Sequence, residues 1–189
     1  LTPPLSTHNP STTGIRPPAG TATVAARAST GQSATTGTIN VASAARITAK
    51  SSGDLGTMAG PLTGSGALEK TGSGAIFITG DASGYTGPVT QTGGVLQIAS
   101  GVTLGASSVG VSGGVLINNG TLSGPLTVAA GTTTINNGAI PGALAVPGTA
   151  NVTLNGTQGG NVAVEDNGIL GGEGTINGAL TLGSATPVT

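Results

Sequence analysis

A serine flanked by glycines is the first candidate for chemistry in this sequence. The segment Gly110-Val111-Ser112-Gly113-Gly114 matches the Gly-x-Ser-x-Gly pattern, in which a nucleophilic serine stands on a turn between a strand and a helix. A second strand-like run, Val115-Leu116-Ile117, follows it, and the single histidine of the chain is His8, far away in a proline-rich segment. The segment Gly80-Asp81-Ala82-Ser83-Gly84 is superficially similar to the serine loop of a protease, but it too has no histidine nearby to act as a base. We therefore interpret both segments as turns rather than nucleophile sites.

The carboxylates are the second candidate, since glycosidases need two convergent acids and Ca²⁺-dependent lyases need a cluster of acidic ligands. Neighbouring residues on a strand point to opposite faces, which would separate Glu165 from Asp166. No Lys, Arg or His follows Lys70, so acid–base partners are missing there. We predict no catalytic, cofactor-binding or metal-binding residue and no cofactor, and the chain is not expected to be an enzyme. The six acids are Asp54, Glu69, Asp81, Glu165, Asp166 and Glu173.

The composition excludes several classes of partner. Charged residues make up 6% of the 189 residues, the net charge is -1, and all five basic residues fall in the first 70 positions, so no basic surface for nucleic acid is expected. No apolar run approaches the roughly 18 residues that cross a bilayer, so this segment is not expected to insert into a membrane. Phe77 and Tyr85 are the only aromatic residues. Any core must therefore be thin and built from small aliphatic side chains.

Two regions follow each other along the chain. Residues 1–36 hold five of the 11 prolines among Ser, Thr and Gly, without a hydrophobic period, and we expect a disordered linker there. From Thr38 onward, short apolar triplets such as Ile39-Asn40-Val41 alternate with Gly, Ser and Asn. We assign residues 37–189 to one repetitive domain.

The strongest signal in the sequence is an internal repeat. Segments beginning at Gly120, Gly138, Gly156 and Gly174 keep two glycines and two apolar positions in register. The apolar positions flank a small or polar residue, which is the period-two pattern of a strand with one buried face. Stacked copies would form two apolar columns, one of Leu126, Leu144, Val162 and Leu180 and the other of Val128, Val146, Val164 and Leu182.

This repeat predicts an all-β fold, a right-handed single-stranded parallel β-helix with three faces and rungs of about 18–20 residues. Seven or eight coils would give a rod roughly 35 Å long at one strand spacing per coil. Glycines at the corners are expected to supply positive φ, and the Asn-Asn-Gly corners at 118–120 and 136–138 are expected to serve the same need. Since neither end offers a cap, we expect the chain to be part of something longer.

A regular threonine array is a further possibility, because ice-binding solenoids display flat rows of Thr. One column holds Thr121, Thr157 and Thr175, but Ala139 interrupts it. Thr127 and Thr181 are likewise separated by Ala145 and Ala163. Since Thr is also a common strand residue, we interpret these columns as ordinary strand positions.

One segment, residues 62–97, resembles a known repeat family. It contains Gly64-Ser65-Gly66-Ala67-Leu68-Glu69-Lys70-Thr71-Gly72, an alternating strand, Tyr85-Thr86-Gly87 and a return at Gly94-Val95-Leu96-Gln97. In this order and spacing they are similar to the autotransporter-associated β-strand repeat, also called the passenger-associated transport repeat. Pro88 departs from the family pattern. The autochaperone segment and C-terminal membrane barrel that this family implies are not among these 189 residues.

The resemblance implies an exported passenger fragment at the bacterial cell surface or outside the cell. We expect a non-catalytic stalk that displays or spaces other regions of its protein and aids its own secretion. Its expected partner is a C-terminal translocator barrel, absent from this chain. An adhesin segment that binds a host-surface or matrix ligand is the alternative, and a polysaccharide-active β-helix enzyme is a weaker one.

Overall fold

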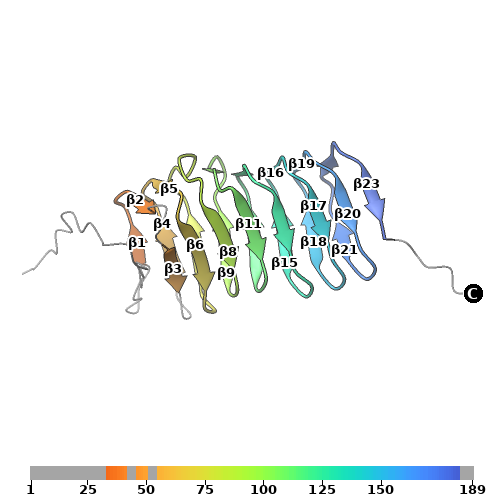
Figure 1. Cartoon of the computed structure of the whole chain (residues 1–189), viewed down its shortest axis with the longest axis horizontal. Helices are drawn as coiled ribbons and strands as arrows, with labels where there is room; N and C mark the ends of the chain where they lie inside the picture. Colours follow the sequence, from red (N-terminus) through yellow and green to blue (C-terminus); the bar gives the residue numbers. More distant parts are fainter. Residues whose placement is uncertain (1–32, 42–45, 51–54, 184–189) are drawn as a thin grey trace, which may run out of the picture.

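The chain forms one stack of parallel β-strands. The computed structural model describes residues 33–41, 46–50 and 55–183, and within these ranges the secondary structure consists of strands and turns without a helix (Figure 1). The all-β prediction is therefore confirmed. Most of the expected linker, including His8, lies outside the described residues. However, β1 (Ser33–Thr35) pairs with a later strand, so the first coil begins inside the range 1–36 that was assigned to the linker.

Three faces run the length of the stack, and the chain visits them in the same order in each coil. Face 1 is an eight-stranded sheet of β1, β4 (Leu55–Met58), β7 (Ala75–Ile78), β9 (Val95–Ile98), β12 (Val115–Asn118), β15 (Thr133–Asn136), β18 (Asn151–Leu154) and β21 (Ile169–Gly171). Face 2 holds a two-stranded sheet of β2 (Ile39–Val41) and β5 (Leu62–Gly64), and a five-stranded sheet of β10 (Thr103–Leu104), β13 (Thr121–Leu122), β16 (Ala139–Ile140), β19 (Thr157–Gln158) and β22 (Thr175–Ile176). Face 3 is an eight-stranded sheet of β3 (Arg46–Lys50), β6 (Ala67–Thr71), β8 (Pro88–Gln91), β11 (Ser108–Val111), β14 (Leu126–Val128), β17 (Leu144–Val146), β20 (Val162–Val164) and β23 (Leu180–Leu182).

The strand registers confirm the predicted rung length from Gly56 onward, whereas the first step on face 1, from Ser33 to Gly56, spans 23 residues. On face 1, Gly56 pairs with Ile76, Ile76 with Leu96 and Leu96 with Leu116, so these steps are equal and lie at the upper end of the predicted range. The next three steps, from Leu116 through Thr134 and Val152 to Leu170, are again equal and lie at its lower end. The predicted column of Leu126, Leu144, Val162 and Leu180 is paired in that shorter register on face 3.

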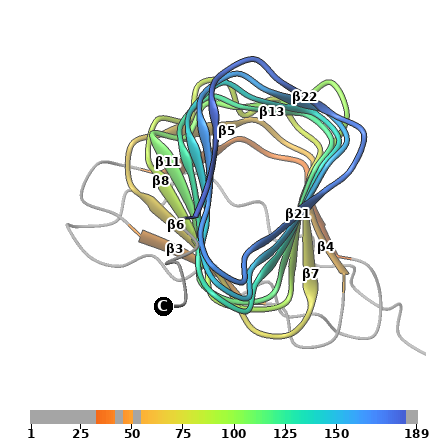
Figure 2. The same cartoon turned by 90° about the vertical axis from the view of Figure 1, so that its right-hand side faces the viewer.

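The coil is right-handed. In the end-on view the chain passes from face 1, marked by β21, through β22 on face 2 to face 3 in a counterclockwise sense (Figure 2). The later coils, in blue, lie nearer the viewer, so the chain advances toward the viewer as it turns counterclockwise. Parallel strand connections take this hand almost without exception.

The core is a thin column of aliphatic side chains inside the coil. Inward positions on all three faces alternate with outward ones, as in β9 and β12, where every second residue is buried. Leu96, Leu116, Leu122 and Leu126 are all at most 2% exposed. Each coil buries only a few such residues, so stability depends on the contacts between neighbouring coils.

The prediction about the Asn-Asn-Gly corners is wrong. Gly120 and Gly138 do not have positive φ, and neither do the asparagines before them. Glycine is required there because the coils approach closely: a Cβ on Gly138 would lie 1.8 Å from the carbonyl oxygen of Gly120. Positive φ occurs instead at other corners, among them Gly72, Gly94, Gly114 and Asn167.

Candidate functional site

Ser112 occupies a corner between two strands. It follows β11 and precedes β12, so the segment 110–114 connects strand to strand, with no helix after the serine. The Ser112 hydroxyl lies 3.1 Å from the carbonyl oxygen of Gln91 in the preceding coil and donates to it. The backbone N–H of Ser112 donates to the same oxygen at 2.8 Å. The serine therefore links neighbouring coils.

The segment 80–84 is a turn of the kind that the sequence predicted. The Asp81 carboxylate accepts the backbone N–H of Ser83 at 3.0 Å, which is a common turn arrangement. Hydrogen bonds from the backbone and side chain of Ser83 lower the pKa of Asp81 below its usual value. A carboxylate stabilised in its ionised form at the surface is poorly suited to act as a proton donor near neutral pH.

The remaining acids are dispersed. Glu165 and Asp166 come directly after β20 rather than within a strand, and both side chains are exposed. Glu173 is exposed in the corner between β21 and β22, and Asp54 lies outside the described residues. Across the ranges that the structure describes, no three His, Asp or Glu side chains gather where they could hold a metal ion.

Lys70 is the unexpected titratable group, because it points into the core. It is 1% exposed, and its Nζ donates to the carbonyl oxygens of Thr71, Gly72 and Gly93 at 2.9, 3.1 and 3.1 Å. Burial lowers the pKa of Lys70 below its usual value. Three carbonyl partners use all three donors of the ammonium group, so this lysine is committed to structure.

Gln91 continues the inward polar column above Lys70. The two residues are paired in register between β6 and β8, and the column goes on to Val111. The Gln91 Nε2 donates to the carbonyl oxygens of Gly94 at 3.0 Å and Val115 at 2.9 Å. Both polar side chains therefore satisfy backbone groups at the corner between faces 3 and 1.

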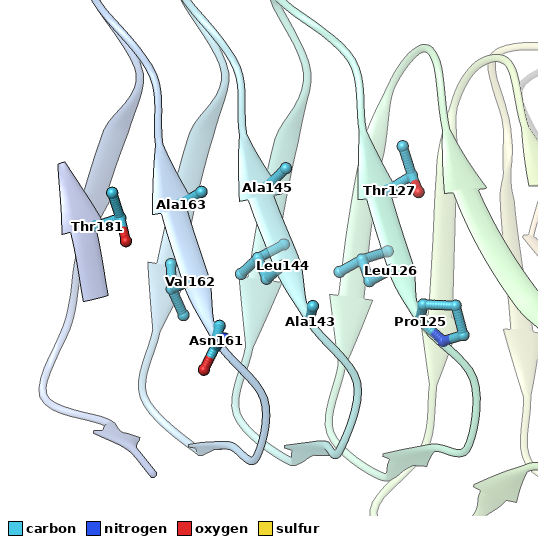
Figure 3. Close-up of a pocket in the computed structure, with 10 residues that line it drawn as sticks. All are labelled: Pro125, Leu126, Thr127, Ala143, Leu144, Ala145, Asn161, Val162, Ala163 and Thr181. Atoms are coloured by element: carbon cyan, nitrogen blue, oxygen red, sulfur yellow. The ribbon is translucent and has the colours of Figure 1, made fainter. Parts of the chain in front are cut away.

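A shallow depression of about 460 Å³ lies on the outer surface of face 3 (Figure 3). Its outward side chains are small, with Thr127, Ala145, Ala163 and Thr181 forming one column in register. Asn161 lies at one corner, where its Oδ1 accepts the backbone N–H of Ala179 at 2.9 Å. None of the lining residues is charged, so the depression holds no group that could act as an acid, a base or an ionic ligand. The lining residues are Pro125, Leu126, Thr127, Ala143, Leu144, Ala145, Asn161, Val162, Ala163 and Thr181.

The threonine columns have the registers that the sequence predicted. Thr121 pairs with Ala139, Ala139 with Thr157, and Thr157 with Thr175 along face 2. Alanine therefore interrupts the hydroxyl row within the stack itself. The array is too irregular to act as a flat row of hydroxyl groups.

The outer surface of face 1 carries apolar side chains that sequence reasoning did not single out. One outward column runs from Phe77 through Gln97 and Ile117 to Ile135, and these residues are partly exposed. A neighbouring outward column includes Val95 and Val115, also partly exposed. We call Phe77, Val95, Val115, Ile117 and Ile135 the face 1 patch. The available sequence signal was the run Val115-Leu116-Ile117, in which alternation fails because both faces of the strand are apolar.

No protein-family model matches the chain, and no curated protein matches it either. Among the residues that the structure describes, no helix is long and apolar enough to span a membrane.

Proposed function

We propose that this chain is a non-catalytic stalk within an exported bacterial protein, which displays or spaces other regions at the cell surface. The observation that carries the proposal is the uninterrupted stack itself: eight strands of face 1 and eight of face 3 follow one another in register. Such a stack supplies length and stiffness through repeated backbone hydrogen bonds, without needing bulky or charged side chains.

The dispersed titratable groups support the same proposal. Ser112 bonds to the coil beneath it, Lys70 bonds to three carbonyl oxygens, and Glu165, Asp166 and Glu173 stand on exposed corners. Acid–base catalysis needs positioned groups within hydrogen-bond reach of one substrate atom.

The resemblance of residues 62–97 to the autotransporter passenger repeat supports the export part of the proposal. This segment spans β5 to β9, and its Lys70 and Tyr85 make contacts between coils. Coils that stack vertically can add one at a time as the chain emerges from a membrane pore, each coil serving as the template for the next. The proposed partner is a C-terminal translocator barrel of the same protein.

Deletion of whole coils in the natural gene tests the stalk. Removal of residues 138–155 joins Asn137 to Gly156 and preserves the columns, because the deleted segment is one complete rung. We expect the shortened protein to reach the cell surface and to hold its distal regions closer to the membrane. The matched control removes residues 138–146, half a rung, which brings Thr153 of face 1 against Leu126 of face 3 and should abolish surface display.

Two outcomes would contradict the proposal. If both deletions are displayed equally, coil register has no part in export. If the in-register deletion removes an activity of the purified chain, the segment is more than a spacer. The coding sequence after Thr189 gives an independent check, since alternating segments of roughly ten residues would indicate an outer-membrane barrel.

A binding function is the second candidate, and the face 1 patch favours it. Contiguous apolar side chains on an outer surface are typical of interaction sites. Replacing Ile117 and Ile135 by Thr, the residue that Thr153 already supplies in the same column, should leave the fold intact. Loss of cell adhesion with unchanged display would support binding through this patch. Unchanged adhesion would count against it, and Thr127→Ala on face 3 is the matched control.

A further inference from the structure

We propose that Asn177 is a site of spontaneous deamidation, and that the stacking of coils protects the chemically equivalent asparagines at 119, 137 and 155. Five asparagines of the chain are followed directly by glycine: Asn119, Asn137, Asn155, Asn167 and Asn177. Glycine has no side chain to hinder attack by its own backbone nitrogen. The five sites therefore share the same intrinsic reactivity and differ only in their surroundings.

The reaction needs two groups to be free. The backbone nitrogen of the glycine loses its proton to solvent base and attacks Cγ of the asparagine. A new N–Cγ bond forms, the Cγ–Nδ2 bond breaks, and ammonia leaves after taking up a proton. Water then opens the cyclic imide at either carbonyl carbon, which gives aspartate or isoaspartate. A glycine N–H held by a hydrogen bond, or a side chain held in place, must first be released.

Side chains at one corner form a ladder along the stack. The Nδ2 of Asn137 donates to Oδ1 of Asn119 at 2.8 Å, and the Nδ2 of Asn155 donates to Oδ1 of Asn137 at 2.9 Å. Each bond joins residues 18 positions apart, in successive coils. The amide groups of Asn137 and Asn155 are therefore held along the stack and cannot rotate freely toward their own glycine nitrogen.

The glycine nitrogens at this corner are engaged as well. Gly138 N–H donates to the carbonyl oxygen of Asn118 at 3.0 Å, and Gly156 N–H donates to that of Asn136 at 2.9 Å. Gly120 N–H donates to Oδ1 of Asn118 at 3.2 Å. Reaction at these sites requires local opening of contacts between coils, and the rate falls with the population of the open form.

Asn177 has neither protection. It is exposed in the last described coil, and the residue beneath it in register is Gly159, which has no side chain to bond. Among the described residues, Gly178 N–H donates no hydrogen bond. Asn167 is intermediate, because Gly168 N–H donates to the carbonyl oxygen of Glu165 at 2.9 Å within a local turn.

Modification at Asn177 would weaken the contacts between the last two coils of the stack. Gly178 lies so close to Gly160 that a Cβ added to it would be 2.5 Å from the Gly160 backbone. Isoaspartate lengthens the main chain by one carbon directly before this contact. We expect the change to loosen β23, which pairs with β20 through Leu180, Thr181 and Leu182.

Peptide mapping of the whole chain by mass spectrometry tests the proposal. The protein is incubated in mildly alkaline buffer, natively and in denaturant, and the conversion of each Asn-Gly pair is followed over time. In denaturant the five rates should agree within roughly three-fold. In the native protein Asn177 should stay within roughly three-fold of its denatured rate, while Asn119, Asn137 and Asn155 should slow by roughly ten-fold or more. Equal slowing at all five sites, or modification of the ladder as fast as Asn177, would overturn the proposal.

Two variants separate the parts of the argument. Asn119→Ala removes the acceptor for the Asn137 amide and leaves the bond from Gly138 N–H to Asn118 in place, so Asn137 should react several-fold faster with an unchanged circular dichroism spectrum. An unchanged Asn137 rate would overturn the role given to the side-chain ladder. Asn177→Gln is the control, because glutamine would have to form a six-membered ring, and the early product should disappear.

Discussion

The phenolic oxygen of Tyr85 lies 2.7 Å from the carbonyl oxygen of Gly66 in the preceding coil and 2.8 Å from that of Pro88. Tyr85 is fully buried, so its single proton is shared between two backbone acceptors inside the stack. The residue therefore joins one coil to the next at the corner that leads into face 3.

Tyr85→Phe should destabilise the chain by roughly 1–3 kcal/mol, because the ring stays buried while two carbonyl groups lose their donor. Urea unfolding measures the free energy of unfolding. Thr86→Ala is the neighbouring control, since Thr86 is exposed and its hydroxyl bond to Gly64 is long, at 3.4 Å. A Tyr85→Phe value no larger than that of Thr86→Ala would contradict the role of the hydroxyl.

The stability should also fall in strong alkali. Burial raises the pKa of Tyr85 from 10.0 to about 12. Its contribution is therefore complete below pH 10 and is lost as the pH rises toward 12, because the unfolded chain gives up the proton first. The free energy of unfolding should fall by roughly 3 kcal/mol across this range, since each pKa unit corresponds to about 1.4 kcal/mol. The chain has one Tyr and no Trp, so tyrosinate absorbance reports this group alone.

Lys70 acts in the opposite direction at lower pH, which allows the two groups to be separated. Burial lowers the pKa of Lys70, so the folded chain releases this proton at a lower pH than the unfolded chain does. The free energy of unfolding therefore rises with pH up to 10.5, the ordinary pKa of lysine, and Lys70 adds no further change above that pH. The decline above that value belongs to Tyr85 and should vanish in Tyr85→Phe. A decline that persists in the variant would refute the assignment.

Lys70→Met should cost roughly 2–4 kcal/mol, since three buried carbonyl groups lose a charged donor while the aliphatic stem is retained. Thermal or urea unfolding gives the difference from the parent chain. Thr127→Ala is the control: the position is outward and the next coils already carry Ala145 and Ala163, so its effect should stay within about 0.5 kcal/mol. Equal effects for both variants would show that the carbonyl contacts contribute nothing.

Substitutions at two glycines test how closely neighbouring coils approach each other. Gly138→Ala places a Cβ 1.8 Å from the carbonyl oxygen of Gly120, so we expect a loss of roughly 3 kcal/mol or more, or failure to fold. In Gly110→Ala the nearest atom is 3.9 Å away, and the variant should be neutral or more stable by about 0.5 kcal/mol. Circular dichroism and urea unfolding compare them. If Gly138→Ala were as stable as Gly110→Ala, the coils could not be packed as closely as described.

The apolar columns were predictable because a strictly kept period leaves few choices. Leu126, Leu144 and Val162 each precede a small or polar residue and then a second apolar one, so alternation alone indicates the buried face. The Gly-x-Ser-x-Gly segment was likewise recognisable as a corner, since apolar runs lie on both sides of it. The coil length, the parallel stack and the absence of a helix in the described ranges follow from the same pattern.

Where neighbouring residues have the same polarity, the alternation of apolar and polar residues does not show which side chain points inward. At those positions the tertiary structure decided the direction. In Asn118-Asn119 and Asn136-Asn137 both members are polar, yet Asn118 and Asn136 point inward and share a 2.8 Å hydrogen bond, while Asn119 and Asn137 form the outer ladder. In Val115-Leu116-Ile117 both faces are apolar, and only the stack shows which side meets solvent.

The sequence by itself determined the coil, its period and most of its aliphatic core, because those features repeat at positions that local alternation identifies. Only the tertiary structure decided that Lys70 is buried and that Gly138 is required by close approach rather than by positive φ. The carbonyl oxygens that hold Lys70 and exclude a Cβ at Gly138 belong to neighbouring coils as well as to the local chain. Such contacts depend on how one coil packs against the next, and local alternation does not specify that packing.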